Sequence, residues 1–224
     1  FIHCKQFIKP ARINNRNPRL VEQFWHYDGV RVGMRKAITP LHRYIATTIT
    51  AKYRTFVWLH PSKLADATVV AIARSDDATF GILQSRLHTI WALAAGSTLE
   101  DRPRYVTGAC FHTFPFPENF TPADTAHQHV ENVGGLLIPA GLEGEVDVTP
   151  PEKSSTKKRR KVPEMPVEPA FLAPKVIAYN IARAAHRLNE LRENWLNPPE
   201  WTQKVPEIIP HGMTESPYPD RILP

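Results

Sequence analysis

The sequence predicts an α+β fold: a small mixed sheet with packed helices, followed by a flexible proline-rich insertion and a C-terminal helix. Three runs rich in β-branched and apolar residues lie between positions 43 and 74, and an amphipathic helical pattern follows them directly. Seventeen of the 22 prolines lie from Pro115 onward, so the second half is much richer in proline than the first. With 224 residues, 42% of them apolar, the chain is long enough to bury a core.

Two short helices are expected before the sheet. The first covers residues 18–27 and begins at Pro18, where the missing N–H costs nothing. The second runs from Met34 toward Leu41, and Pro40 ends it.

Three strands are expected next, at residues 43–50, 55–60 and 67–74. The second is apolar on both faces, which is typical of a central strand. The link at 51–54 is short enough for a hairpin.

A single helix is expected from Ser75 to Gly96. Ser75, Asp76 and Asp77 provide a cap and negative charge at its N-terminus. Apolar residues then recur every three or four positions until Gly96, a residue type that often ends helices.

Periodicity is lost between positions 121 and 173, which contain a basic cluster at Lys157–Lys161 and several prolines. Such a segment buries too little apolar surface to offset its ordering entropy, so we expect it to be mostly flexible. The cluster suits nuclear import or loose phosphate contact, and a solvated linker explains it equally well. A helix is expected from Pro174 to the pair Pro198-Pro199, followed by an extended tail.

The residues offer little sign of a complete active site. Asn197-Pro-Pro-Glu200 resembles the Asn-Pro-Pro-aromatic tetrad of amino-group methyltransferases, but a charged helix precedes it and Glu200 replaces the ring. We interpret it as a helix-ending turn. Cys110 and His112 provide only half of a zinc site, so no metal is expected. No glycine-rich loop follows a strand, so no cofactor is expected in this part of the protein.

Positive charge is concentrated at the N-terminal end. Residues 1–60 contain eleven Lys and Arg against two acids, whereas residues 61–150 contain five against eleven. This asymmetry favours a face that binds a polyanion, although a solvated surface is the simpler alternative. The predicted DNA-binding residues are those that lie among rigid elements: Arg31, Arg35, Lys36, Arg43, Lys52 and Arg54.

Several motifs occur in a fixed order: Arg43-Tyr-Ile-Ala-Thr47, Phe56-Val-Trp-Leu59, Ile72-Ala-Arg-Ser-Asp-Asp77, Phe80-Gly-Ile-Leu83, Ser85-Arg-Leu-His88, Trp91-Ala-Leu93, Leu99-Glu-Asp-Arg-Pro-Arg-Tyr105, Thr113-Phe-Pro-Phe-Pro117, Arg187-Leu-Asn-Glu-Leu-Arg192 and Trp195-Leu-Asn-Pro-Pro-Glu-Trp201. Together they resemble the C-terminal, target-recognition and helical part of the MmeI-like DNA methyltransferases of restriction-modification and related defence systems.

The resemblance implies that the chain recognises double-stranded DNA for an enzyme that methylates adenine N6. The catalytic domain and its S-adenosylmethionine site would lie upstream in the same polypeptide, and we expect this chain to be the C-terminal portion of a longer cytoplasmic protein. The implied domains are a target-recognition domain (1–120), an insertion (121–173), a helical segment (174–201) and a tail (202–224). No base-reading residue can be carried over by motif.

Two alternatives remain open. The chain could be a freestanding DNA-binding protein without catalysis, or a structural or interaction fragment whose acidic middle contacts a protein. No apolar run is long enough to span a membrane, so no membrane association is expected.

Overall fold

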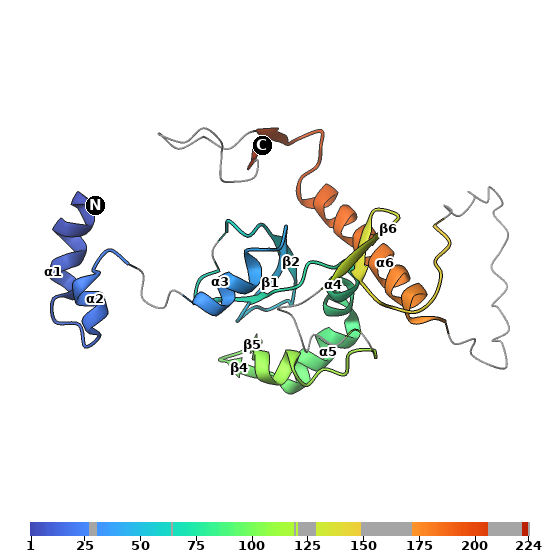
Figure 1. The fold of residues 1–224 in the computed structure, drawn as a ribbon, viewed down its shortest axis with the longest axis horizontal. Coiled ribbons are helices and arrows are strands. Elements are labelled where there is room, and N and C mark those ends of the chain that lie inside the picture. The colour runs from blue at the N-terminus through green and yellow to red at the C-terminus, as the bar shows by residue number, and fades with distance from the viewer. Residues whose placement is uncertain are drawn as a thin grey trace. The chain divides into compact units, whose positions relative to one another are not determined.

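The computed structural model describes residues 1–26, 31–63, 65–118, 120, 129–148, 172–205 and 221–223. The chain forms two units, residues 1–36 and 37–224, and Figure 1 labels most of their helices and several of their strands. Parts of three predicted segments lie outside the described residues: the end of the first helix (27), most of the insertion (121–128 and 149–171) and most of the tail (206–220 and 224).

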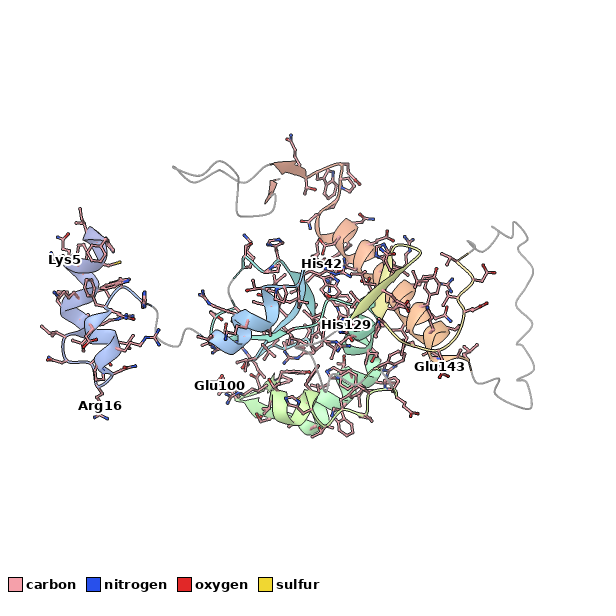
Figure 2. The ribbon with its side chains drawn as sticks, viewed as in Figure 1. Lys5, Arg16, His42, Glu100, His129 and Glu143 are labelled. Atoms are coloured by element: carbon pink, nitrogen blue, oxygen red, sulfur yellow. The ribbon has the colours of Figure 1, made fainter. Side chains whose placement is uncertain are left out.

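Unit 1 is helical. It contains a π-helical turn η1 (Cys4–Ile8) and the helices α1 (Lys9–Arg12) and α2 (Pro18–Glu22). The start of α2 is confirmed: Pro18 follows Asn17, whose side chain accepts a hydrogen bond from the N–H of Arg19. Lys5 and Arg16 mark this basic unit in Figure 2. Helix α3 (Val32–Ile38) carries residues of both units.

The expected α+β class is confirmed in unit 2. Its main sheet contains β1 (Tyr44–Thr48), β2 (Val57–Leu59) and β3 (Val69–Ile72), as predicted, in the order β2-β1-β3. Both pairings are antiparallel, so this sheet is not mixed. The prediction that residues 55–60 form the central strand is wrong, because β2 is at an edge; its apolar Trp58 stacks on Phe80 of the next helix instead.

The predicted single helix at 75–96 is two helices, α4 (Asp77–Gln84) and α5 (Arg86–Ala95). Asp76 caps α4 by accepting from the N–H of Thr79 at 2.7 Å. Ser85 takes an extended conformation between the helices and caps α5 by accepting from the N–H of His88 at 3.1 Å. Gly96 ends α5, as predicted.

A hairpin and a π-helical turn follow α5. The hairpin joins β4 (Ser97–Leu99) to β5 (Arg102–Arg104). The turn η2 (Thr107–Phe111) buries Cys110 and Phe111 in the core formed with β1, β3, α4 and α5.

Residues 129–148 correct part of the predicted flexible insertion. They contain an antiparallel hairpin of β6 (Val130–Val133) and β7 (Leu136–Pro139), and Leu136, Ile138 and Leu142 are buried. The hairpin is ordered because these side chains share a core with α4 and with α6 (Pro174–Leu196).

Helix α6 begins at Pro174, as predicted, and packs closely on α4. A Cβ at Gly81 would lie 2.7 Å from Cγ2 of Ile181, so the glycine permits this close approach. In the predicted tail, β8 (Gln203–Val205) pairs with β9 (Arg221–Leu223). Among the described helices, none is long and apolar enough to cross a membrane.

Candidate nucleic-acid interface

The link between β1 and β2 presents the exposed side chains of Lys52 and Tyr53 at its tip. Tyr53 is 76% exposed, and the Nζ of Lys52 lies 5.5 Å from the centre of its ring. The predicted hairpin therefore forms and places Lys52 at its tip, where it is accessible to a ligand.

Strand β5 lies directly beside this tip. The N–H of Ala51 donates to the carbonyl of Pro103 at 3.2 Å, and Thr50 forms a β-bridge with Arg104. The exposed Arg102 and Arg104 are thus brought to the same edge as Lys52. We name these three cations the basic rim: Lys52, Arg102 and Arg104.

The basic rim is available for an anion. Among the described residues, none of its three side chains forms a hydrogen bond or ion pair, and the Lys52 ammonium lies near the ring of Tyr53. Two acids, Glu100 and Asp101, occupy the turn between β4 and β5, where Glu100 is labelled in Figure 2. They offset part of the positive charge next to Arg102.

Arg54 was predicted to contact DNA, but its guanidinium serves the protein. The guanidinium lies 5.1 Å from the ring centre of Tyr105. Burial lowers the pKa of Arg54. The guanidinium donates to four acceptors: Thr47 Oγ1 at 3.1 Å, the Thr48 carbonyl, the Ile49 carbonyl at 3.3 Å and the Pro103 carbonyl at 3.4 Å. Arg54 therefore joins the end of β1 to β5 and holds the hairpin tip beside β5.

Tyr105 continues this connection into the core. Its hydroxyl lies 3.0 Å from Nε2 of His88, which is fully buried on α5. Burial, with a smaller contribution from the Arg54 charge, lowers the pKa of His88 to about 4. Burial raises the pKa of Tyr105. Both groups are therefore neutral near pH 7, which is consistent with a structural role.

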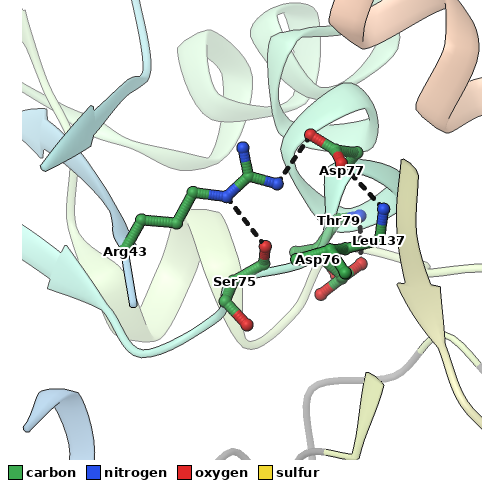
Figure 3. A network of polar contacts seen from close by, with 6 residues as sticks. All are labelled: Arg43, Ser75, Asp76, Asp77, Thr79 and Leu137. Atoms are coloured by element: carbon green, nitrogen blue, oxygen red, sulfur yellow. Dashed lines mark hydrogen bonds and ion pairs between the residues drawn. The ribbon is translucent and has the colours of Figure 1, made fainter. Parts of the chain in front are cut away.

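Arg43, also predicted to contact DNA, is at the centre of an internal network (Figure 3). Its Nη2 lies 2.9 Å from the Asp77 carboxylate, its Nε donates to the Ser75 carbonyl at 3.1 Å, and its guanidinium lies 3.9 Å from the ring centre of Trp58. Asp77 also accepts from the N–H of Leu137 at 3.0 Å. Arg43 therefore connects the sheet to the start of α4.

The remaining predicted DNA-binding residues, Arg31, Arg35 and Lys36, are exposed and belong to unit 1. Arg31 has a positive φ of 45° just before α3, and the other two lie in its last turn. Their role in DNA binding stays a prediction.

Sequence reasoning missed Arg102 and Arg104. The signal was the Arg-Pro-Arg run directly before the buried Tyr105, which predicts a short edge strand with outward-facing arginines. What joins this run to Lys52 is a pairing between segments about fifty positions apart, which the sequence does not reveal.

The other candidate sites have structural explanations. Asn197 is the C-cap of α6, and its amide donates to the Glu193 carboxylate at 3.1 Å, so its interpretation as a helix-ending residue is confirmed. Cys110 is buried, and its Sγ lies 3.6 Å from the carbonyl of Ala92. The described part of the chain contains no group of three His, Cys, Asp or Glu that could hold a metal ion.

Residues 38–118 match the family model of the MmeI target recognition domain. The match confirms the resemblance for the motifs between Arg43 and Pro117 and indicates DNA sequence recognition in a restriction-modification system of this type. It contains β1 to β5, both helices α4 and α5, and all three cations of the basic rim. No curated protein and no solved structure matches the chain.

Proposed function

We propose that this chain recognises a specific duplex sequence for an adenine-N6 DNA methyltransferase of a restriction-modification or related defence system. The observation that carries the proposal is the basic rim, three cations on one edge of the segment that matches a target recognition domain. The methyltransferase domain would lie upstream in the same polypeptide and act on DNA in the cytoplasm.

The chemistry of the basic rim suits DNA. Lysine acts as a point charge for phosphate, while arginine can also form paired hydrogen bonds with guanine in the major groove. A two-stranded ribbon such as β4–β5 is narrow enough to enter that groove. Arg102 and Arg104 are therefore candidates for base reading, and Lys52 for positioning on the backbone.

We propose that S-adenosylmethionine binds outside this chain. Gly81 lies inside α4 and Gly96 ends α5, so neither opens a loop between a strand and a helix. Asn197 bonds a carboxylate of its own helix instead of facing a substrate amine. We therefore derive no step of methyl transfer from this chain and assign the reaction to the upstream domain.

Two experiments test the proposal. In the first, the 224-residue chain selects duplexes from a random pool, and sequencing of the retained DNA should reveal one recurrent sequence. In the second, the complete polypeptide is incubated with that duplex and S-adenosylmethionine, and nucleoside mass spectrometry should detect N6-methyladenine.

The outcomes separate the alternatives. If a sequence is selected but the complete polypeptide methylates nothing, the chain is a DNA-binding protein without catalysis. Methylation of cytosine would contradict the adenine assignment. If no sequence is enriched, sequence recognition by this chain is wrong.

A further inference from the structure

We propose that Tyr53 is a base-stacking residue, whose ring packs against the face of a nucleobase when the basic rim binds DNA. This inference rests on the proposed function and specifies how the hairpin tip contacts the duplex. Three observations support it: the exposure of the ring, the hydrogen bonds that anchor the residues next to it, and the positive charge around it.

The ring of Tyr53 is placed outward at the tip of the link between two paired strands. It is 76% exposed, and the Lys52 ammonium lies 5.5 Å from its centre. An aromatic ring left in water forgoes the burial that normally stabilises a fold. The position therefore suits a ring that is buried by a ligand.

Hydrogen bonds anchor the two residues that flank the Lys52–Tyr53 tip, Ala51 and Arg54. On one side, Ala51 donates to the Pro103 carbonyl at 3.2 Å. On the other, Arg54 binds carbonyls of β1 and β5 through its guanidinium. A ring presented on a fixed tip loses little conformational entropy on binding, so more of its stacking energy is available as affinity.

The charge near Tyr53 selects the kind of partner. Lys52 is adjacent, and Arg102 and Arg104 lie on the strand that pairs with the link. Cations beside an exposed aromatic ring suit a ligand with both phosphates and flat apolar faces, as nucleic acids have. In a duplex, stacking of the ring on a base face requires that one base step be partly unstacked.

The test uses the 224-residue chain and a duplex that it selects from a random pool, with dissociation constants measured across a salt series. Tyr53→Ala should weaken binding roughly fivefold or more at every salt concentration, the loss expected for one stacked base. Tyr53→Phe keeps the ring face and should bind within about twofold of the wild type. The slope of log K against log salt should be the same for all three proteins, because stacking releases no counterions.

Lys52→Ala is the matched control, because it removes the neighbouring charge and should flatten the slope by about 0.9. A similar flattening in Tyr53→Ala would mean that the ring only positions the Lys52 ammonium, which overturns the inference. Wild-type affinity in Tyr53→Ala overturns it, and so does a loss in Tyr53→Phe as large as that in Tyr53→Ala, because the hydroxyl would then be the contact.

These results are distinguishable from failure of the proposed function. If the wild-type chain selects no sequence, both proposals fail. If the wild type selects and binds a duplex, only the stacking role fails when Tyr53→Ala retains wild-type affinity or flattens the salt slope. The same holds when Tyr53→Phe loses as much affinity as Tyr53→Ala. Thermal unfolding of Tyr53→Ala should match the wild type, since the exposed ring contributes little to the fold.

Discussion

The guanidinium of Arg43 and the carboxylate of Asp77 lie 2.9 Å apart, and this ion pair joins the sheet to the first turn of α4. The side chain of Asp77 is only 5% exposed, and it also accepts from the backbone N–H of Leu137. One carboxylate thus connects three segments: the sheet, α4 and the β6–β7 hairpin (Figure 3).

Asp77→Asn should destabilise the fold by about 1–3 kcal/mol, because the partly buried Arg43 guanidinium loses its counter-charge. Arg43→Lys should cost less, since it keeps the charge but loses the bond from Nε to the Ser75 carbonyl and the stacking on Trp58. Urea unfolding measures both. The DNA affinity of folded Arg43→Lys should equal that of the wild type. A loss of affinity without a loss of stability would indicate that Arg43 contacts DNA directly.

Gly81→Ala should destabilise the chain by about 1–3 kcal/mol, because the new Cβ would lie 2.7 Å from Cγ2 of Ile181 and 3.0 Å from Cβ of Ala185. Gly108→Ala is the matched control, since a Cβ there meets nothing within 4 Å. Thermal unfolding of the two variants provides the comparison. Equal melting temperatures would contradict the close packing of α4 on α6.

Arg54→Lys should lower stability by about 1–3 kcal/mol, because a lysine cannot reach the four acceptors that the guanidinium binds. Lys52→Arg, two residues away and exposed, should leave stability unchanged. The midpoints of denaturant unfolding measure this difference. If Arg54→Lys is as stable as the wild type, the guanidinium does not organise the hairpin tip.

Acid should destabilise the fold through His88. Its pKa of about 4 in the folded chain lies below the ordinary value of 6.5, so the unfolded chain binds the proton more readily. The free energy of unfolding is therefore unaffected by His88 above pH 6.5. It falls by up to about 3 kcal/mol as the pH decreases from 6.5 toward 4.

His88→Gln cannot titrate and should remove this part of the pH dependence. The comparison is urea unfolding of the wild type and the variant between pH 7 and pH 4. The wild type should lose more stability over this range than the variant. Parallel curves would show that His88 does not supply the acid sensitivity.

The local elements could be predicted from the sequence. The three strands, the capped start of α4, the stop at Gly96 and the start of α6 at Pro174 each depend on residues within a few positions. The break at Ser85 was missed because the apolar stripe continues across it, although Ser85 is itself an N-cap residue type.

Features that depend on distant segments could not be predicted. The β6–β7 hairpin is ordered by burial of Leu136 and Ile138 against α4 and α6, and nothing within the hairpin sequence reveals those partners. The same holds for the DNA surface. Arginine is a common DNA-contacting residue type, so the sequence favoured Arg43 and Arg54. In the fold, their guanidinium groups bind the Asp77 carboxylate and the Pro103 carbonyl, which belong to other segments.

The most direct test of the account is the salt dependence of DNA affinity after the basic rim is removed. The triple variant Lys52→Ala, Arg102→Ala, Arg104→Ala should bind the selected duplex far more weakly and flatten the slope of log K against log salt by at least about 0.9, the contribution of the Lys52 phosphate contact. Arg86→Ala, at the start of the ten-residue helix α5, removes a single charge away from the basic rim and should retain wild-type affinity. A triple variant with wild-type affinity and slope would contradict the assignment of DNA binding to this edge.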